Sequence, residues 1–316
     1  MKKTRVAYLI SIITILAIFL VGCGSQSTKS PEKNNASSSS QTSKPKQVVN
    51  LPKPTKSKVL RKSIYSANLQ RKWHYFVYLP KNYHRLVAQN YHFPVIYLLH
   101  GMEGAGSNFF QEVDSKNYLD QLETAYQQKA VVIAPSYQNS FMLNYGKGAD
   151  YENAFMKELI PKTTATYHLQ NANGRSLLGI SMGGYVSSRL SLKYPNSFKS
   201  VMLISPAVWK VVPPIIQANP QAPAFKINGR YSQKLYDSLF PTKYLKRYLS
   251  VNQLNTKFYV ESSREDTTVP FINVETFVKN LKQAGIPVTF IADNFGGHTW
   301  PYWQIAVRQG YNFLLK

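Results

Sequence analysis

The sequence predicts an α/β fold in which a mostly parallel central sheet is covered by helices on both faces. Short apolar runs alternate with longer segments of helical periodicity, which is typical of β-α-β crossovers. Several of the short runs are apolar throughout, as expected for strands buried on both faces. The expected strands are 73–80, 94–100, 130–135, 176–180, 200–204, 257–260 and 288–291. The expected helices are 117–128, 152–167, 182–193, 271–284 and 302–315.

The composition excludes several classes of protein. The chain has 316 residues, of which 44% are hydrophobic, so it is too apolar to be wholly disordered. Its single cysteine excludes a disulfide framework, an iron–sulfur cluster and a cysteine-rich zinc site. No metal-binding or nucleotide-binding motif is present, so we expect no cofactor. The formal charge is +23, but no nucleic-acid-binding motif accompanies it, so we expect no nucleic-acid partner.

The N-terminus has the pattern of a secretion signal. A basic start is followed by an apolar stretch over residues 6–21 and then by Leu20-Val21-Gly22-Cys23, which resembles the lipobox of bacterial lipoproteins. The resemblance implies that residues 1–22 are a signal peptide and that Cys23 is lipidated. It also implies an extracytoplasmic, membrane-anchored location. An ordinary signal peptide or an uncleaved anchor is the alternative.

Residues 23–57 are expected to form a disordered tether. They are rich in Ser and Lys and contain few large apolar residues, so they cannot bury enough surface to offset their chain entropy. The lysines are suited to contact an anionic cell-wall polymer or the membrane, although they would also simply keep the tether hydrated.

Residues 58–316 are expected to form the globular domain, with an insertion at about 207–248. The insertion interrupts the alternation of strands and helices and is rich in prolines and aromatic residues. We expect it to lie over the sheet and to form part of a substrate pocket. A purely structural flap is the alternative.

A glycine-rich turn marks the candidate nucleophile. Ser181 lies in Gly179-Ile180-Ser181-Met182-Gly183-Gly184, between an apolar strand and a helix. Small residues two positions before and after the serine permit the sharp turn that exposes a nucleophile above a sheet. The oxyanion donors are then expected to be the backbone N–H groups of Met182 and of Met102, which lies in the loop after the strand 94–100.

His298 is the expected general base, because it lies in a glycine-containing loop between the last strand and the last helix. His100 is expected to brace its loop, and the other four histidines are expected to have surface or core roles. Asp266 is the expected acid, since it follows a strand and preserves the chain order Ser, Asp, His. Glu265 and Glu261 remain alternatives.

These motifs together resemble the esterase D type of α/β-hydrolase. That group includes S-formylglutathione hydrolases and bacterial tributyrin and feruloyl esterases, and it is related to mycolyltransferases. The matching segments are Tyr97–Gly101, Tyr151-Glu152, Glu158–Pro161, Gly179–Gly184, Asp266 and Gly297–Trp300. The resemblance implies an α/β-hydrolase fold and a triad of Ser181, Asp266 and His298.

The predicted function is that of a serine carboxylesterase acting on short-chain or aromatic, hydroxycinnamoyl-type esters through an acyl-enzyme on Ser181. An envelope acyltransferase with the same triad, a peptidase and a non-catalytic binding protein on a hydrolase scaffold are the alternatives. The segment 207–248 matches no subgroup, so the resemblance does not identify the substrate.

Overall fold

An eight-stranded sheet is the centre of the structure, a computed structural model that describes residues 51–315. The strand order is β1-β2-β4-β3-β5-β6-β9-β10. The two neighbour pairs β1–β2 and β2–β4 are antiparallel, and all the following neighbours are parallel. The strands are β1 (Lys58–Ser66), β2 (Arg71–Leu79), β3 (Val95–Leu99), β4 (Val131–Pro135), β5 (Arg175–Ile180), β6 (Ser200–Ile204), β9 (Lys257–Ser263) and β10 (Val288–Asp293).

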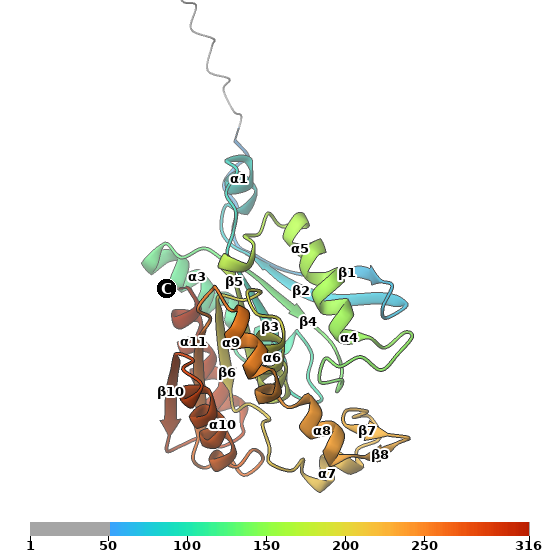
Figure 1. Ribbon diagram of the computed structural model, residues 1–316. Helices are drawn as coiled ribbons and strands as arrows, with labels where there is room; N and C mark the ends of the chain where they lie inside the picture. Colours follow the sequence, from blue (N-terminus) through green and yellow to red (C-terminus); the bar gives the residue numbers. More distant parts are fainter. Residues whose placement is uncertain (1–50, 316) are drawn as a thin grey trace, which may run out of the picture. The chain divides into compact units, whose positions relative to one another are not determined.

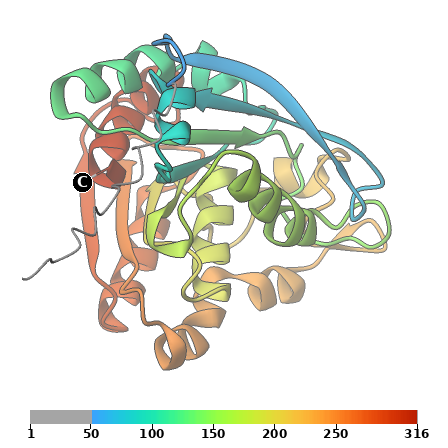
Figure 2. The same ribbon diagram turned by 90° about the horizontal axis from the view of Figure 1, so that it is seen from above.

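Helices cover both faces of this sheet (Figures 1 and 2). One apolar cluster packs α5, α6 and α10 against one face, and a second packs α2, α3 and α11 against the other. The helices are α1 (Tyr83–Ala88), α2 (Asn108–Gln111), α3 (Ser115–Tyr126), α4 (Tyr151–Asn153), the π-helical η1 (Ala154–Leu159), α5 (Ile160–Thr166), the 3-10 turn η2 (Ala172–Gly174), α6 (Met182–Lys193), α7 (Pro214–Ala218), α8 (Gln233–Leu239), the 3-10 turn η3 (Pro241–Tyr244), α9 (Leu245–Val251), α10 (Phe271–Gln283) and α11 (Trp300–Leu315). The predicted fold class is therefore confirmed.

The most continuous of the predicted apolar runs form strands that are buried on both faces. Every residue of β3, β4 and β6 is buried, because helices lie above and below them. β1 is not predicted from the sequence; it is an edge strand in which three of nine residues are charged and only Ser66 is buried. Its pairing with β2 gives it structure without a recognisable apolar pattern.

The segment expected to be an insertion has two parts. Its first part contains α7, α8 and the small hairpin of β7 (Lys226–Ile227) and β8 (Arg230–Tyr231), which lie together (Figure 1). Its second part, η3 and α9, packs on α6 and completes the crossover from β6 to β9. The expected insertion therefore includes one regular covering element of the fold.

The start of the domain lies earlier than the predicted residue 58. Ser57 is buried, and its hydroxyl donates to Asp120 Oδ2 at 2.7 Å. Thr55 N donates to Asn82 Oδ1 at 3.0 Å, and Asn82 N donates back to Thr55 O at 2.9 Å. These bonds correct the predicted tether boundary. The predicted signal peptide, Cys23 and the rest of the tether up to residue 50 lie outside the described residues.

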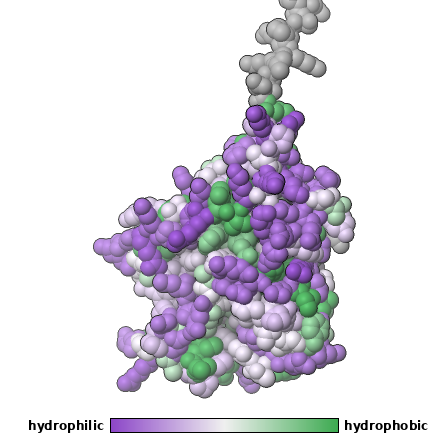
Figure 3. Space-filling view, turned by 180° about the vertical axis from the view of Figure 1, so that it is seen from behind, coloured by the Kyte–Doolittle hydropathy of each residue, from purple (hydrophilic) through white to green (hydrophobic). Residues whose placement is uncertain are grey.

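One face of the described part is largely hydrophilic (Figure 3). The face seen in Figure 3 is covered mostly by hydrophilic residues, with a few separate apolar patches. Within residues 51–315, no helix combines the length and the apolar character that a membrane span requires.

Candidate active site

Ser181 lies at a strained turn between β5 and α6. Its backbone has φ 53° and ψ −114°, a conformation that costs free energy for a residue with a side chain. The turn is held because Ser181 N donates to Ile204 O at 2.9 Å and Ser181 O accepts from Ala207 N at 3.0 Å. A Cβ on Gly183 would lie 1.9 Å from Leu99 O, so only glycine lets α6 approach β3 this closely.

The structure brings the three predicted side chains into one hydrogen-bonded relay. Asp266 Oδ2 lies 2.7 Å from His298 Nδ1, and His298 Nε2 lies 2.9 Å from Ser181 Oγ. The carboxylate accepts a hydrogen bond from Nδ1–H, which leaves Nε2 as the acceptor for the serine hydroxyl. Ser181, His298 and Asp266 therefore have the geometry that general-base activation of a serine requires.

The loop after β9 fixes the position of Asp266. Its Oδ1 accepts the backbone N–H groups of Thr268 at 2.9 Å and Val269 at 2.8 Å, and its side chain is fully buried. The remaining oxygen is thus directed to His298. A carboxylate held by three donors is oriented without further reorganisation.

The two alternative acids occupy other positions. Glu265 Oε2 accepts Gly296 N–H at 3.0 Å, so this residue braces the loop that carries His298. Ser263 Oγ accepts Gly297 N–H at 3.1 Å and so braces the same loop. Glu261 is completely buried, and neither of its carboxylate oxygens has a hydrogen-bond partner within residues 51–315. Burial, together with the nearby Asp293, raises the pKa of Glu261 to about 7.

Met102 and Met182, whose N–H groups are the expected oxyanion donors, both lie close to Ser181. Met182 is the first residue of α6, directly after Ser181, and Met102 lines the same cavity as Ser181. Neither backbone N–H donates to an acceptor within residues 51–315. Gly101, which precedes Met102, lies directly against the nucleophile, because a Cβ there would be in van der Waals contact with Ser181 Cβ at 3.5 Å. The two N–H groups thus remain available as hydrogen-bond donors.

His100 braces the loop that carries Met102. Its Nδ1 lies 2.7 Å from Gly101 O, and its Nε2 accepts Tyr137 N–H at 3.1 Å. The ring stacks on Tyr137 with 4.1 Å between the ring centroids. Burial lowers the pKa of His100 to about 4, so it is neutral, and it takes no part in the relay.

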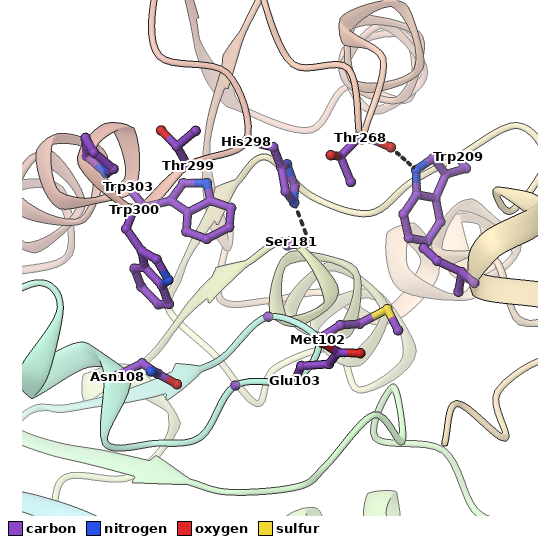
Figure 4. A pocket seen from close by; sticks show the side chains of 14 residues that line it. Met102, Glu103, Asn108, Ser181, Trp209, Thr268, His298, Thr299, Trp300 and Trp303 are labelled. Atoms are coloured by element: carbon purple, nitrogen blue, oxygen red, sulfur yellow. Dashed lines mark hydrogen bonds between the residues drawn. The ribbon is translucent and has the colours of Figure 1, made fainter. Parts of the chain in front are cut away.

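A cavity of about 610 Å³ opens over Ser181 (Figure 4). Three tryptophans line it on two sides of the serine: Trp209 on one side, Trp300 and Trp303 on the other. The Trp303 ring meets the His298 ring edge-on, at 4.9 Å between centroids. The cavity is thus lined largely by aromatic and small side chains, which suits an apolar group attached to a carbonyl.

Part of the cavity wall comes from the segment after β6. Trp209 Nε1 donates to Thr268 O at 2.9 Å, which ties this segment to the loop of Asp266. Ile216 of α7 also lines the cavity. The expectation that the insertion contributes to the pocket is met by these two residues.

Trp303 and Glu103 also line this cavity, and no role was predicted for them from the sequence. Glu103 is the acidic residue in an otherwise small and apolar segment, Gly101–Gly106, which could have drawn attention to it. Trp303 gives no such signal, because aromatic residues more often fill cores.

Three comparisons place the chain among known proteins. The model of a family described as "Putative esterase" matches residues 66–314. An acetyl esterase of Caldicellulosiruptor saccharolyticus is 27% identical over 241 residues, which cover 70% of this chain and 83% of that protein. A solved ferulic acid esterase has a TM-score of 0.66 at 22% identity, covering 82% of this chain and 98% of its own. An S-formylglutathione hydrolase of Staphylococcus aureus has a TM-score of 0.65 at 16% identity, covering 84% and 99%.

Proposed function

The chain belongs to the putative esterase family and is a serine ester hydrolase of α/β-hydrolase fold, and from this premise we propose that it cleaves short-chain or aromatic carboxylic esters through an acyl-enzyme on Ser181. The predicted resemblance to feruloyl esterases and S-formylglutathione hydrolases is confirmed. The observation that carries the proposal is the relay of Asp266, His298 and Ser181 at the floor of the tryptophan-lined cavity.

Each step of the proposed reaction uses a group that is already in place. Ser181 Oγ attacks the ester carbonyl while His298 Nε2 takes the hydroxyl proton. The negative charge that forms on the carbonyl oxygen is stabilised by the N–H groups of Met102 and Met182. His298 then gives its proton to the leaving alcohol, the ester C–O bond breaks, and water activated by His298 releases the acid.

The cavity supports the proposed acyl specificity. Trp209, Trp300 and Trp303 present flat apolar surfaces around the serine, and these suit a planar aromatic acyl group or a short alkyl one. Two of the similar proteins are named for such substrates, an acetyl esterase and a ferulic acid esterase.

The experiment that tests the proposal combines active-site labelling with kinetics. A fluorophosphonate probe should modify Ser181, and the purified protein should hydrolyse p-nitrophenyl acetate, p-nitrophenyl butyrate and methyl ferulate. Ser181→Ala should lose labelling and at least several hundred-fold of kcat. Full turnover by a folded Ser181→Ala protein would refute the mechanism. Transfer of most acyl groups to an added alcohol rather than to water would instead indicate an acyltransferase.

The N-terminal pattern supports a second part of the proposal, a lipid anchor at Cys23 on the outer side of the membrane. The basic start, the apolar stretch and the lone cysteine are the features that support it. Cys23→Ala should leave an unprocessed leader or move the protein out of the membrane fraction. A Cys23→Ala protein that is still acylated and membrane-bound would refute the anchor without affecting the esterase proposal.

A further inference from the structure

A second cavity adjoins the catalytic one. It has a volume of about 700 Å³ and shares Glu103 and Gly104 with the cavity over Ser181. Its other lining residues are Gln138, Asn139 and Gln221, so its lining is amides, one glycine and one carboxylate. The two cavities therefore differ in character: the first is aromatic and the second is polar.

Glu103 is fixed at the junction by its backbone. Its φ of 58° places it in the left-handed region, and its N–H donates to Asn139 Oδ1 at 2.7 Å. Asn139 is itself buried, with 5% of its surface exposed. Figure 4 shows the Glu103 side chain beside that of Met102, on the other side of Ser181 from His298. Glu103 thus lines both the cavity over Ser181 and the polar cavity beside it.

The carboxylate of Glu103 has no protein partner. It makes no hydrogen bond or ion pair within residues 51–315, although the chain has 38 Lys and Arg residues against 15 Asp and Glu residues. Glu103 is also the sole Asp, Glu, Lys or Arg among the residues that line either cavity. In a strongly basic protein, the cavities beside the nucleophile therefore carry a free negative charge, which favours a cation and disfavours an anion.

We infer that the polar cavity receives the alcohol part of an ester whose alcohol carries a cationic ammonium group, and that Glu103 is the residue that selects it. The inference rests on the proposed function, because it assigns the alcohol side of the same site. The tryptophans line the first cavity on both sides of Ser181, and this cavity suits the acyl group, so the adjoining amide-lined cavity is left for the alcohol (Figure 4). A neutral polyol would use the amides alone, whereas a cation also uses the free carboxylate.

Two isosteric esters test the inference. Acetylcholine and neohexyl acetate have the same shape, but a carbon replaces the quaternary nitrogen in the second. The kcat/KM ratio of the two esters, normalised to their rates of alkaline hydrolysis, isolates the effect of charge. We expect the wild type to favour acetylcholine and Glu103→Gln to lower the ratio about three- to ten-fold, since a solvent-exposed carboxylate is partly screened. High salt should shrink the preference of the wild type.

Glu112→Gln is the matched control. Glu112 is also exposed and lies near α2, but it lines neither cavity, so its loss changes the net charge without changing the site. Its ratio should equal that of the wild type. A ratio unchanged by Glu103→Gln, or lowered equally by Glu112→Gln, would overturn the inference and leave the esterase proposal intact. Absence of Ser181-dependent turnover of acetylcholine would also overturn the inference, and the esterase proposal would fall with it only if p-nitrophenyl acetate and methyl ferulate were not hydrolysed either.

Discussion

Asp266 contributes to the site by fixing which nitrogen of His298 carries the proton. Its carboxylate accepts from Nδ1 at 2.7 Å, so Nε2 is free to accept from Ser181. Asp266→Asn presents an amide that can donate to Nδ1 and so favours the wrong tautomer. We expect kcat to fall about 10³–10⁴-fold with the fold intact, as measured with p-nitrophenyl acetate and circular dichroism.

Glu265→Gln is the comparison for this prediction. The amide oxygen of the variant can still accept Gly296 N–H, so the loop of His298 keeps its brace. We expect activity to stay within about ten-fold of the wild type, the scale of one weakened hydrogen bond. If Glu265→Gln fell as far as Asp266→Asn, the assignment of the acid would be wrong.

Glu261 makes the stability of the protein depend on pH. Its pKa is about 7 in the folded protein, against an ordinary value of 4.5, because burial and Asp293 disfavour its charged form. The folded state therefore holds a proton that the unfolded state has lost, and stability falls as pH rises from about 4.5 through 7. Glu261→Gln should remove this penalty, which is about 3 kcal/mol above pH 7.

Urea unfolding at pH 5 and pH 8 measures this effect. The variant should be more stable than the wild type at pH 8, and the difference should shrink toward pH 5. Glu275→Gln on the exposed surface of α10 is the control and should show no such dependence. Equal stability of Glu261→Gln and wild type at pH 8 would contradict the prediction.

The packing of α6 against the sheet depends on a close backbone contact between α6 and β3. A Cβ on Gly183 would lie 1.9 Å from Leu99 O and 2.9 Å from His100 O, and both are backbone atoms that cannot move aside. Gly183→Ala must therefore push α6 and Ser181 away from the sheet. We expect a loss of about 3 kcal/mol of unfolding free energy, or no soluble protein, measured by urea unfolding.

Gly310→Ala in α11 separates this steric effect from a general effect of alanine in a buried helix. Its Cβ would lie 3.0 Å from side-chain atoms of Leu178 and Met202, which can shift. The cost should be smaller than at Gly183. Equal unfolding midpoints for Gly183→Ala and wild type would show that the turn tolerates a side chain.

Sequence patterns predict best the strands whose residues are all buried to the same extent. β3, β4 and β6 are buried on both faces and read as continuous apolar runs. The segment 152–167 is expected as one helix, and the structure has a continuous helical segment there. Its middle part, η1, is π-helical between α4 and α5, and the apolar periodicity of the sequence does not predict this.

The same reasoning explains which parts of the site were predictable. Ser181 and His298 lie within local motifs, so a short stretch of sequence identifies them. The polar cavity is assembled from Glu103, Gln138 and Gln221, which lie in three separate loops. No local pattern brings these residues together, and only the tertiary structure shows that they adjoin Ser181.

At the scale of the whole molecule, the start of the domain has energetic consequences. Thr55 and Ser57 hydrogen-bond to Asn82 and Asp120, so a chain that begins at residue 58 leaves the latter two without these partners. Two or three lost hydrogen bonds amount to about 2 kcal/mol, which corresponds to a melting temperature lower by about 3–6 °C in a protein of this size. A chain that begins at residue 50 should retain the higher melting temperature.

Ser57→Ala in the chain that begins at residue 50 measures the part of this loss that comes from one hydrogen bond, which the Ser57 hydroxyl donates to Asp120 Oδ2 at 2.7 Å. It should lower the melting temperature by less than the truncation does, because the Thr55–Asn82 pair remains. The kcat for p-nitrophenyl acetate should be the same in both chains at a temperature where both are folded, since residues 51–57 do not line the cavity over Ser181. Equal melting temperatures for the two chains would place the energetic start of the domain at residue 58, where the composition of the sequence predicts it.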